Sequence, residues 1–246
     1  MEINKEDFYW EAGQVDEVFL LDLSWVMYKS YYGYDNLSVE IDGIERFTGH
    51  IYGVIRTLMS IKEYNNKAMI VLCEDGNPEE RREENEDYKA NREHDLKFNI
   101  WDDLNVIYDM AYRMRSVYKA YNPKLEADDL LYAISKNIEK ETENTYVYIH
   151  SSDNDLLQAL SDKVKIVRKV SKYEIDVIDK DNLYDRKSMV KNFRNCPVDK
   201  LAFYRAIVGD KSDNLEGLSR FPRKFATKIA KKCDEIEDLV GLEDEF

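Results

Sequence analysis

The chain has 246 residues, of which 35% are charged, and a formal net charge of −14 at pH 7. This length is ample for a hydrophobic core and suits one α/β domain with an appendage, or two small domains. No stretch approaches the roughly 20 apolar residues of a membrane span, and the amino terminus is acidic rather than a basic leader, so an unexported, cytoplasmic protein is expected. The three scattered cysteines, Cys73, Cys196 and Cys233, suggest neither a disulfide framework nor a zinc site.

The first part of the chain alternates strand and helix patterns. A continuous apolar run over 18–23 predicts a strand buried on both faces, followed by a helix over 24–32. Residues 37–47 alternate around Asp42-Gly43 and predict a hairpin, after which Thr48 can cap a helix with an apolar face between 51 and 61. A second buried strand over 68–73 ends at Glu74-Asp75-Gly76.

Residues 77–122 form a long, charged, glycine-poor region, and a connector of this length is more often functional than incidental. It shows a helical pattern from about 100 to 121. The patterns that follow predict a helix over 126–140, a strand over 145–150, a helix opening at Asp153 or Asn154, short strands over 164–167 and 173–178, and helices at about 181–192, 197–208 and 223–233.

This alternation predicts an α/β fold with a mainly parallel central sheet flanked by helices, in which ligands bind outside the carboxyl ends of the strands. The predicted organisation is an N-terminal tail (1–17), an α/β domain (18–180) that includes the inserted region 77–122, and a helical C-terminal region (181–246).

Nine carboxylates form five clusters, and four of these clusters lie where a predicted strand ends or a helix begins: Asp22, Asp75, Glu126, Asp128, Asp129, Asp153, Asp155, Asp210 and Asp213. Taken singly, each has an ordinary explanation as a helix cap, a turn residue or a partner of a helix dipole. Because converging acids need a compensating charge and hard divalent cations prefer oxygen ligands, their shared placement favours a metal-dependent phosphodiester hydrolase.

The basic residues are concentrated near the end of the chain. Between 220 and 232 there are six basic residues and no acidic one: Arg220, Arg223, Lys224, Lys228, Lys231 and Lys232. Lys and Arg drive phosphate binding, so this segment could follow a nucleic-acid backbone; a solvated face is the alternative.

Six segments, in order, resemble the 5′ nuclease family, which includes flap endonucleases, the 5′-3′ exonuclease domain of bacterial DNA polymerase I and the phage replication RNase H. They are Leu20-Leu21-Asp22, Val71-Leu72-Cys73-Glu74-Asp75, Tyr88-Lys89-Ala90-Asn91-Arg92, Glu126-Ala127-Asp128-Asp129, Ser151-Ser152-Asp153-Asn154-Asp155-Leu156 and Gly209-Asp210-Lys211-Ser212-Asp213-Asn214. Each string is weak alone, but six in order are highly specific. The resemblance is closest to the phage RNase H and implies a PIN-like 5′ nuclease fold with a helical arch over 77–122 and a helical C-terminal DNA-binding region.

The resemblance also implies a structure-specific 5′-3′ exonuclease or flap endonuclease that uses two Mg²⁺ ions, with Mn²⁺ as a substitute. Around the first metal it places Asp22, Asp75, Glu126, Asp128 and Asp153. Nearer the second it places Asp155, Asp210 and Asp213, with Asp129 shared or outside the ligand shell. Glu74, beside Asp75, leaves that ligand uncertain by one residue.

Catalytic and binding roles for basic residues come from the same resemblance. Lys89 and Arg92, at the foot of the arch, would neutralise phosphate charge in the transition state. Arg81, Arg82 and Tyr88 would contact nucleic acid.

The chain departs from the family after the last aspartates. Cellular members carry a Gly-Val-Pro-Gly-Ile-Gly turn that cradles duplex DNA and a K⁺ ion, where this chain has Gly217-Leu218-Ser219-Arg220-Phe221-Pro222. The resemblance therefore does not carry over the K⁺ site. Instead, point charges would anchor the duplex, contributed by Arg220, Arg223, Lys224 and Lys228.

The implied role is removal of RNA primers or 5′ flaps during DNA replication, in the cytoplasm of a bacterial host if the protein is phage-encoded. The expected partner is a DNA or RNA-DNA duplex with a 5′ end or flap, and a monomer is expected. Phe8-Tyr9-Trp10 would either dock a single-strand-binding protein or sliding clamp, or pack back on the core. The alternatives are a PIN-type ribonuclease, which would lack the long insertion, and a non-catalytic nucleic-acid-binding relative, which should have lost some ligands.

Overall fold

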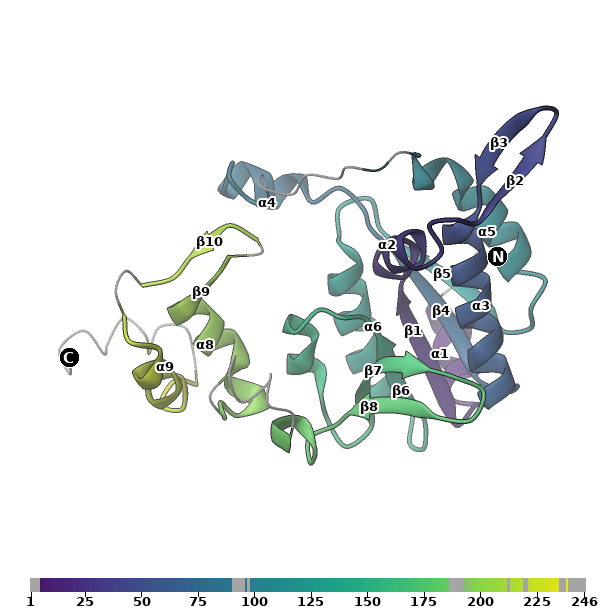
Figure 1. Ribbon diagram of the computed structural model, residues 1–246. Helices are drawn as coiled ribbons and strands as arrows, with labels where there is room; N and C mark the ends of the chain where they lie inside the picture. The colour runs from purple at the N-terminus through teal and green to yellow at the C-terminus, as the bar shows by residue number, and fades with distance from the viewer. Residues whose placement is uncertain are drawn as a thin grey trace. The chain divides into compact units, whose positions relative to one another are not determined.

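The computed structural model describes residues 5–89, 96, 98–185, 193, 195–211, 213–218, 221–234 and 238 (Figure 1). The chain divides into two compact units. The first comprises Met1–Pro78, His94–Ser152 and Ser161–Ile178, and the second comprises Glu79–Glu93, Asp153–Leu160 and Asp179–Phe246. The domain boundaries expected from the sequence, at residues 17 and 180, stay predictions.

The first unit is built on a six-stranded sheet with the order β5-β4-β1-β6-β7-β8. Five strands are parallel: β1 (Glu17–Asp22), β4 (Met69–Glu74), β5 (Val117–Tyr121), β6 (Tyr146–His150) and β7 (Val164–Val170). The edge strand β8 (Ile175–Ile178) is antiparallel to β7. The α/β fold with a mainly parallel sheet is thereby confirmed.

Helices cover both faces of this sheet, which is why its central strands are continuous apolar runs. One layer is formed by α2 (Leu23–Gly33), α3 (Gly49–Tyr64) and α5 (Leu104–Ala111), over a core that includes Phe19 and Leu21. Across the sheet, α6 (Ala127–Glu141) packs on β1, β4, β5 and β6, with α1 (Lys5–Ala12) beside it (Figure 1). Residues 18–21 of β1 are completely buried between the two layers.

The segment expected as an N-terminal tail forms the helix α1 in its described part. The Phe8 ring meets the edge of the Tyr118 ring with centroids 6.4 Å apart, and Phe8 and Tyr9 are half-buried. Trp10, in contrast, is 68% exposed. Two of the three aromatic side chains therefore pack back on the first unit, and docking of a replication partner at this segment stays a prediction.

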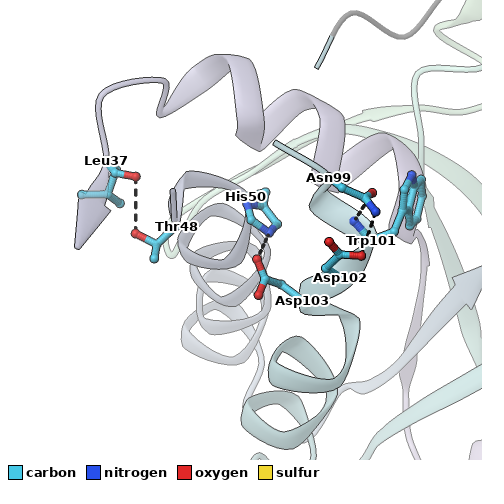
Figure 2. Close-up of polar contacts among 7 residues, drawn as sticks. All are labelled: Leu37, Thr48, His50, Asn99, Trp101, Asp102 and Asp103. Carbon is cyan, nitrogen blue, oxygen red and sulfur yellow. Dashed lines mark hydrogen bonds and ion pairs between the residues drawn. The ribbon is translucent and has the colours of Figure 1, made fainter. Parts of the chain in front are cut away.

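The predicted hairpin is confirmed as β2 (Ser38–Ile41) paired with β3 (Ile44–Phe47). Its turn residues Asp42 (φ 53°) and Gly43 (φ 76°) both adopt the left-handed backbone conformation that a type I′ turn requires. Thr48 is the N-cap residue of α3, as predicted, but its hydroxyl makes no capping bond to the α3 backbone. It donates instead to the carbonyl of Leu37 at 3.4 Å, which closes the base of the hairpin (Figure 2).

A buried histidine joins α3 to a segment within the inserted region. His50 is 1% exposed, and its Nε2 lies 3.1 Å from Oδ2 of Asp103 at the end of η1 (Ile100–Asp103) (Figure 2). Asn99 caps η1 by accepting a hydrogen bond from the backbone N–H of Trp101 at 3.3 Å. Burial lowers the pKa of His50, and Asp103 opposes this effect, so burial favours the neutral imidazole.

Two sequence predictions of helices are wrong in part, one in each unit. The helical pattern over 100–121 becomes η1, α5 and then β5, because pairing with β4 recruits residues 117–121 as an edge strand. Ser116, with φ 57°, makes the turn between them. In the second unit, the helix expected at Asp153 or Asn154 is the 3-10 segment η2 (Asp155–Ala159).

The described residues of the second unit form short helical elements and one small two-stranded sheet. They are α4 (Glu79–Glu84), η2, η3 (Leu183–Asp185), η4 (Val198–Lys200), α8 (Leu201–Val208), β9 (Gly209–Asp210), β10 (Leu215–Glu216) and α9 (Arg223–Ala230). Helices α8 and α9 pack together. Residues 186–192 of the helix predicted over about 181–192, and the arch residues 90–95, lie outside the described residues.

No described helix is long and apolar enough to cross a membrane. The three cysteines are free thiols and all are buried.

Candidate active site

Asp22 lies at the carboxyl end of β1, between the ends of β4 and β6. It is the N-cap residue of α2, and its carboxylate accepts hydrogen bonds from the backbone N–H of Trp25 and from the hydroxyl of Ser151, both at 2.9 Å. Ser151 directly follows β6. The parallel topology therefore fixes one acidic side chain at the edge where the sequence predicted ligand binding.

The adjacent acids Glu74 and Asp75 have different environments. Glu74 accepts a hydrogen bond from the hydroxyl of Tyr108 and pairs with Nζ of Lys119 on β5 at 2.7 Å. Asp75 accepts hydrogen bonds from the hydroxyl of Ser24 and, at 2.7 Å, from the backbone N–H of Ala127. Asp75 thus lies at the first turns of α2 and α6, where the helix dipoles favour negative charge, and this placement favours Asp75 over Glu74 as the site residue.

The acids at the start of α6 divide into two roles. Glu126 and Asp129 form a capping box, in which Asp129 accepts the backbone N–H of Glu126 at 3.0 Å. This explains both residues structurally. Asp128, on the same turn, lies near the buried thiol of Cys73.

Cys73 marks the point at which the first-unit carboxylates converge. Burial raises the pKa of its thiol well above the usual value, and Asp22, Asp128 and Asp75 each raise it further. Asp22 is the register partner of Cys73 across the β1–β4 pairing, and Asp75, two residues after Cys73, bonds the backbone N–H of Ala127, next to Asp128. The three carboxylates therefore lie near one buried group. The structure thereby brings together three predicted site residues from three separate sequence segments.

The second unit holds a second group of predicted acids. Asp153 accepts the backbone N–H of Asp155 at 2.7 Å. The guanidinium of Arg205 bridges two of them, with Nε 2.8 Å from Asp155 and Nη1 3.1 Å from Asp210. Burial raises the pKa of Asp155 to about 6, Arg205 opposes that shift, and the charges of Asp153 and Asp210 add to it.

Asp213 is linked to the foot of the predicted arch. Its carbonyl accepts the backbone N–H of Lys89 at 3.2 Å, and the side chain of Asn214 donates to the carbonyl of Asp87 at 3.1 Å. These bonds join residues about 125 positions apart in the sequence. The Asp210–Asp213 loop and the segment with Lys89 therefore form one structural element of the second unit.

The described residues contain no group of three or more His, Cys, Asp or Glu side chains already arranged to hold a metal ion. The acids instead accept hydrogen bonds or ion pairs from protein groups. Their chemistry fits hard divalent cations, because every candidate donor is a carboxylate oxygen. Asp22, Asp75 and Asp128 would serve one position, and Asp153, Asp155 and Asp210 another.

The predicted basic residues cluster only in part. Tyr88 has Nζ of Lys89 5.0 Å and the guanidinium of Arg81 6.0 Å from its ring centroid, while Arg82 is exposed. On α9, Lys224 and Lys228 are exposed and lie 4.9 and 5.8 Å from the ring centroid of Phe225. Arg92 and Arg220 lie outside the described residues, as does the side chain of Arg223.

Sequence reasoning missed Ser24, Ser151 and Arg205. Ser151 stands in a motif already singled out, so its placement after a strand was a usable signal. Arg205 is fifty residues from Asp155, and no local pattern connects them.

Comparison with known proteins agrees with this geometry. Residues 17–194 match the family model described as the 5′-3′ exonuclease N-terminal resolvase-like domain. The chain belongs to the 5′-3′ exonuclease family. The family predicted from six sequence segments is thus confirmed, and with it the prediction that the protein is a nuclease.

Individual relatives extend over most of the chain. It is 28% identical over 233 residues to a 5′-3′ exonuclease of Aquifex aeolicus, covering 93% of this chain and 74% of the relative. It is 30% identical over 234 residues to DNA polymerase I of Borreliella burgdorferi, covering 91% of this chain but only 23% of that polymerase.

Solved structures show the same fold. The T5 D15 flap endonuclease (D155K), in a pseudo-enzyme-product complex with DNA and metal ions, aligns with a TM-score of 0.65 at 16% identity, covering 92% of this chain and 79% of that one. The T5 D15 protein co-crystallised with metal ions gives a TM-score of 0.66, also at 16% identity, over 92% and 78% of the two chains.

Proposed function

We propose that this enzyme hydrolyses phosphodiester bonds at the 5′ ends and flaps of DNA or RNA-DNA duplexes with two divalent cations, Mg²⁺ in the cell, and removes RNA primers or 5′ flaps during replication. The observation that carries the proposal is the convergence of Asp22, Asp75 and Asp128 around Cys73 at the carboxyl edge of a parallel sheet. The T5 relative's complex with DNA and metal ions supports it. A cytoplasmic location fits the three free thiols.

The chain's own residues would orient the chemistry. When bound, the two cations would supply an activated water and neutralise charge on the scissile phosphate. The hydroxyls of Ser24 and Ser151 and the backbone N–H of Ala127 fix the directions of the Asp75 and Asp22 carboxylates. Preorganised ligands lose little freedom when a cation binds, which strengthens binding.

Lys89 would act on the phosphate. Its backbone is held in the left-handed conformation (φ 56°), its N–H bonds the Asp213 carbonyl, and Tyr88 lies beneath its ammonium. These contacts restrict the side chain, and a fixed cation stabilises charge that develops in the transition state better than a mobile one. Arg92 would share this role. Arg81, Arg82 and Tyr88 would steer the substrate.

The duplex would be anchored by the basic C-terminal segment. Lys224 and Lys228 are exposed on one helix, and Arg220 and Arg223 precede them in the sequence. Such contacts recognise phosphates without reading base sequence. Gly217 has a structural role here, since a Cβ at this position would lie 2.3 Å from the carbonyl carbon of Val208.

One experiment tests the proposal directly. A 5′-labelled DNA flap and a 5′-labelled RNA-primed duplex are incubated with the enzyme, with and without Mg²⁺, and product lengths are measured. We expect Mg²⁺-dependent short products from the labelled 5′ end of both substrates, and activity with Mn²⁺. Cleavage in the presence of a chelator would contradict the metal-dependent mechanism, and binding of both substrates without cleavage would favour the non-catalytic alternative.

A further inference from the structure

Arg205 makes a contact that the proposed chemistry does not require. It lies in the last turn of α8, and its Nε and Nη1 donate to two different carboxylates, those of Asp155 and Asp210. The three side chains are 30%, 39% and 12% exposed, respectively. The permanently charged guanidinium therefore occupies one oxygen of each of two carboxylates that the proposed function treats as cation ligands.

A guanidinium and a divalent cation are rivals at such a position. Both are attracted by the same two carboxylates, and they repel each other. Charge-assisted hydrogen bonds are among the stronger polar contacts in proteins, so a cation must replace these two contacts or bind beside a fixed positive charge. Either way, Arg205 opposes cation binding.

We propose that Arg205 is a counter-ion that holds Asp155 and Asp210 together in the absence of a cation. The cation must displace the Arg205 side chain in order to bind, so Arg205 sets the affinity of the second cation position. The inference rests on the proposed function only in taking these two aspartates as cation ligands. It assigns to Arg205 a positioning role at that site, and no direct contact with the reacting phosphate.

The surroundings of Arg205 provide a place for the displaced side chain. The guanidinium lies 5.3 Å from the ring centroid of Phe193, a distance at which cation–π attraction holds. Asp155, Phe193 and Arg205 also line a cavity of about 110 Å³ together with Asn154, Gln158, Leu201 and Ala202. A cavity of this size holds several water molecules, and a rotated guanidinium can replace them while keeping its contact with Phe193.

The first test measures cation binding without substrate. Free Mn²⁺ is followed by electron paramagnetic resonance during titration of the wild-type protein, Arg205→Gln and a control, Arg56→Gln. The control removes an arginine from an exposed ion pair with Glu63 (3.7 Å) on α3. We expect the weaker of two bound Mn²⁺ ions to bind about 10-fold tighter in Arg205→Gln, and the control to match wild type.

The outcomes separate this proposal from the one on which it rests. Two bound Mn²⁺ ions with unchanged or weaker affinity in Arg205→Gln would overturn the counter-ion role alone, since a residue that merely orients the carboxylates predicts weaker binding. Absence of Mn²⁺ binding in all three proteins would overturn the two-cation function and this inference together.

A second test uses only the wild-type protein, so it does not depend on whether a variant folds. In ¹⁵N-arginine-labelled wild-type protein, the Nε–H resonance of Arg205 is followed by NMR during titration with diamagnetic Mg²⁺. Loss of the bond to Asp155 should shift this resonance and speed its exchange with water, in step with occupancy of the weaker site. An unchanged resonance while that site fills would refute displacement.

Discussion

The two groups of acidic residues are supported by different chemistry. In the first unit, Asp22 and Asp75 accept hydrogen bonds from serine hydroxyls and helix N–H groups. In the second unit, Asp155 and Asp210 pair with the charged Arg205. Neutral donors fix a carboxylate's direction without cancelling its charge, whereas a guanidinium cancels it. Under the proposed function, this difference predicts a tight cation position in the first unit and a weaker, adjustable one in the second.

The largest expected effect on cleavage should distinguish Asp75 from the neighbouring Glu74. Asp75→Asn keeps an oxygen acceptor for Ser24 but removes the charge, so single-turnover cleavage should fall by about 10²–10³-fold. Glu74→Gln is the matched control, because Glu74 pairs with Lys119 rather than facing the helix starts. The control should cleave near the wild-type rate but lose about 1–3 kcal/mol of unfolding free energy in urea. The reverse pattern would move the ligand to Glu74.

Lys89 should come next in size. If its ammonium acts mainly on the transition state, Lys89→Ala should lower turnover by roughly 10²-fold while the dissociation constant for a flap substrate changes little. Single-turnover rates at saturating enzyme, together with binding isotherms in Ca²⁺, measure the two quantities separately. A change in affinity alone would reduce Lys89 to a steering contact.

The sequence predicted the fold where a pattern had one physical cause. Continuous apolar runs identified β1 and β4 because helices cover both of their faces. The sequence prediction was wrong at β5. Its residues fit a helical pattern, but in the fold they pair with β4 as a strand. Local composition cannot reveal such pairing.

The site shows the same limit. The acids at strand ends could be predicted, since parallel topology brings such ends together. Sequence alone could not assign Glu126 and Asp129 to a capping box or pair Glu74 with Lys119, because both depend on side-chain directions. The ion pairs of Arg205 could not be predicted from the sequence for a further reason. They join a helix residue to acids from two other segments, which come together only when the chain folds.

A third prediction contrasts binding with chemistry. Changing both Lys224 and Lys228 to Gln should flatten the slope of log affinity against log salt by about two units, because each lost phosphate contact releases about one counterion fewer. Single-turnover cleavage at saturating enzyme should stay near wild type. Lys136→Gln, which removes a lysine paired with Glu139 on α6, is the control. Duplex affinity that depends on K⁺ specifically, with an unchanged slope in the double variant, would favour a retained K⁺ site.

The smallest expected effect concerns Asp103, whose carboxylate lies beside His50 and outside the proposed active site. Burial lowers the pKa of His50 beside Asp103, so below pH 6.5 the unfolded chain binds a proton that the folded chain does not. Stability supplied by neutral His50 is therefore present above pH 6.5 and is lost as the pH falls through the folded pKa. His50→Gln can keep a donor to Asp103 but cannot titrate. Urea titrations at each pH measure the unfolding free energy. Between pH 7 and 5, the decrease in unfolding free energy should be smaller for His50→Gln than for wild type, by up to about 1 kcal/mol. Equal losses in both proteins would mean that the pKa of His50 does not differ between the folded and unfolded chains. A larger loss for His50→Gln than for wild type would mean that His50 is protonated in the fold and that Asp103 is held by an ion pair.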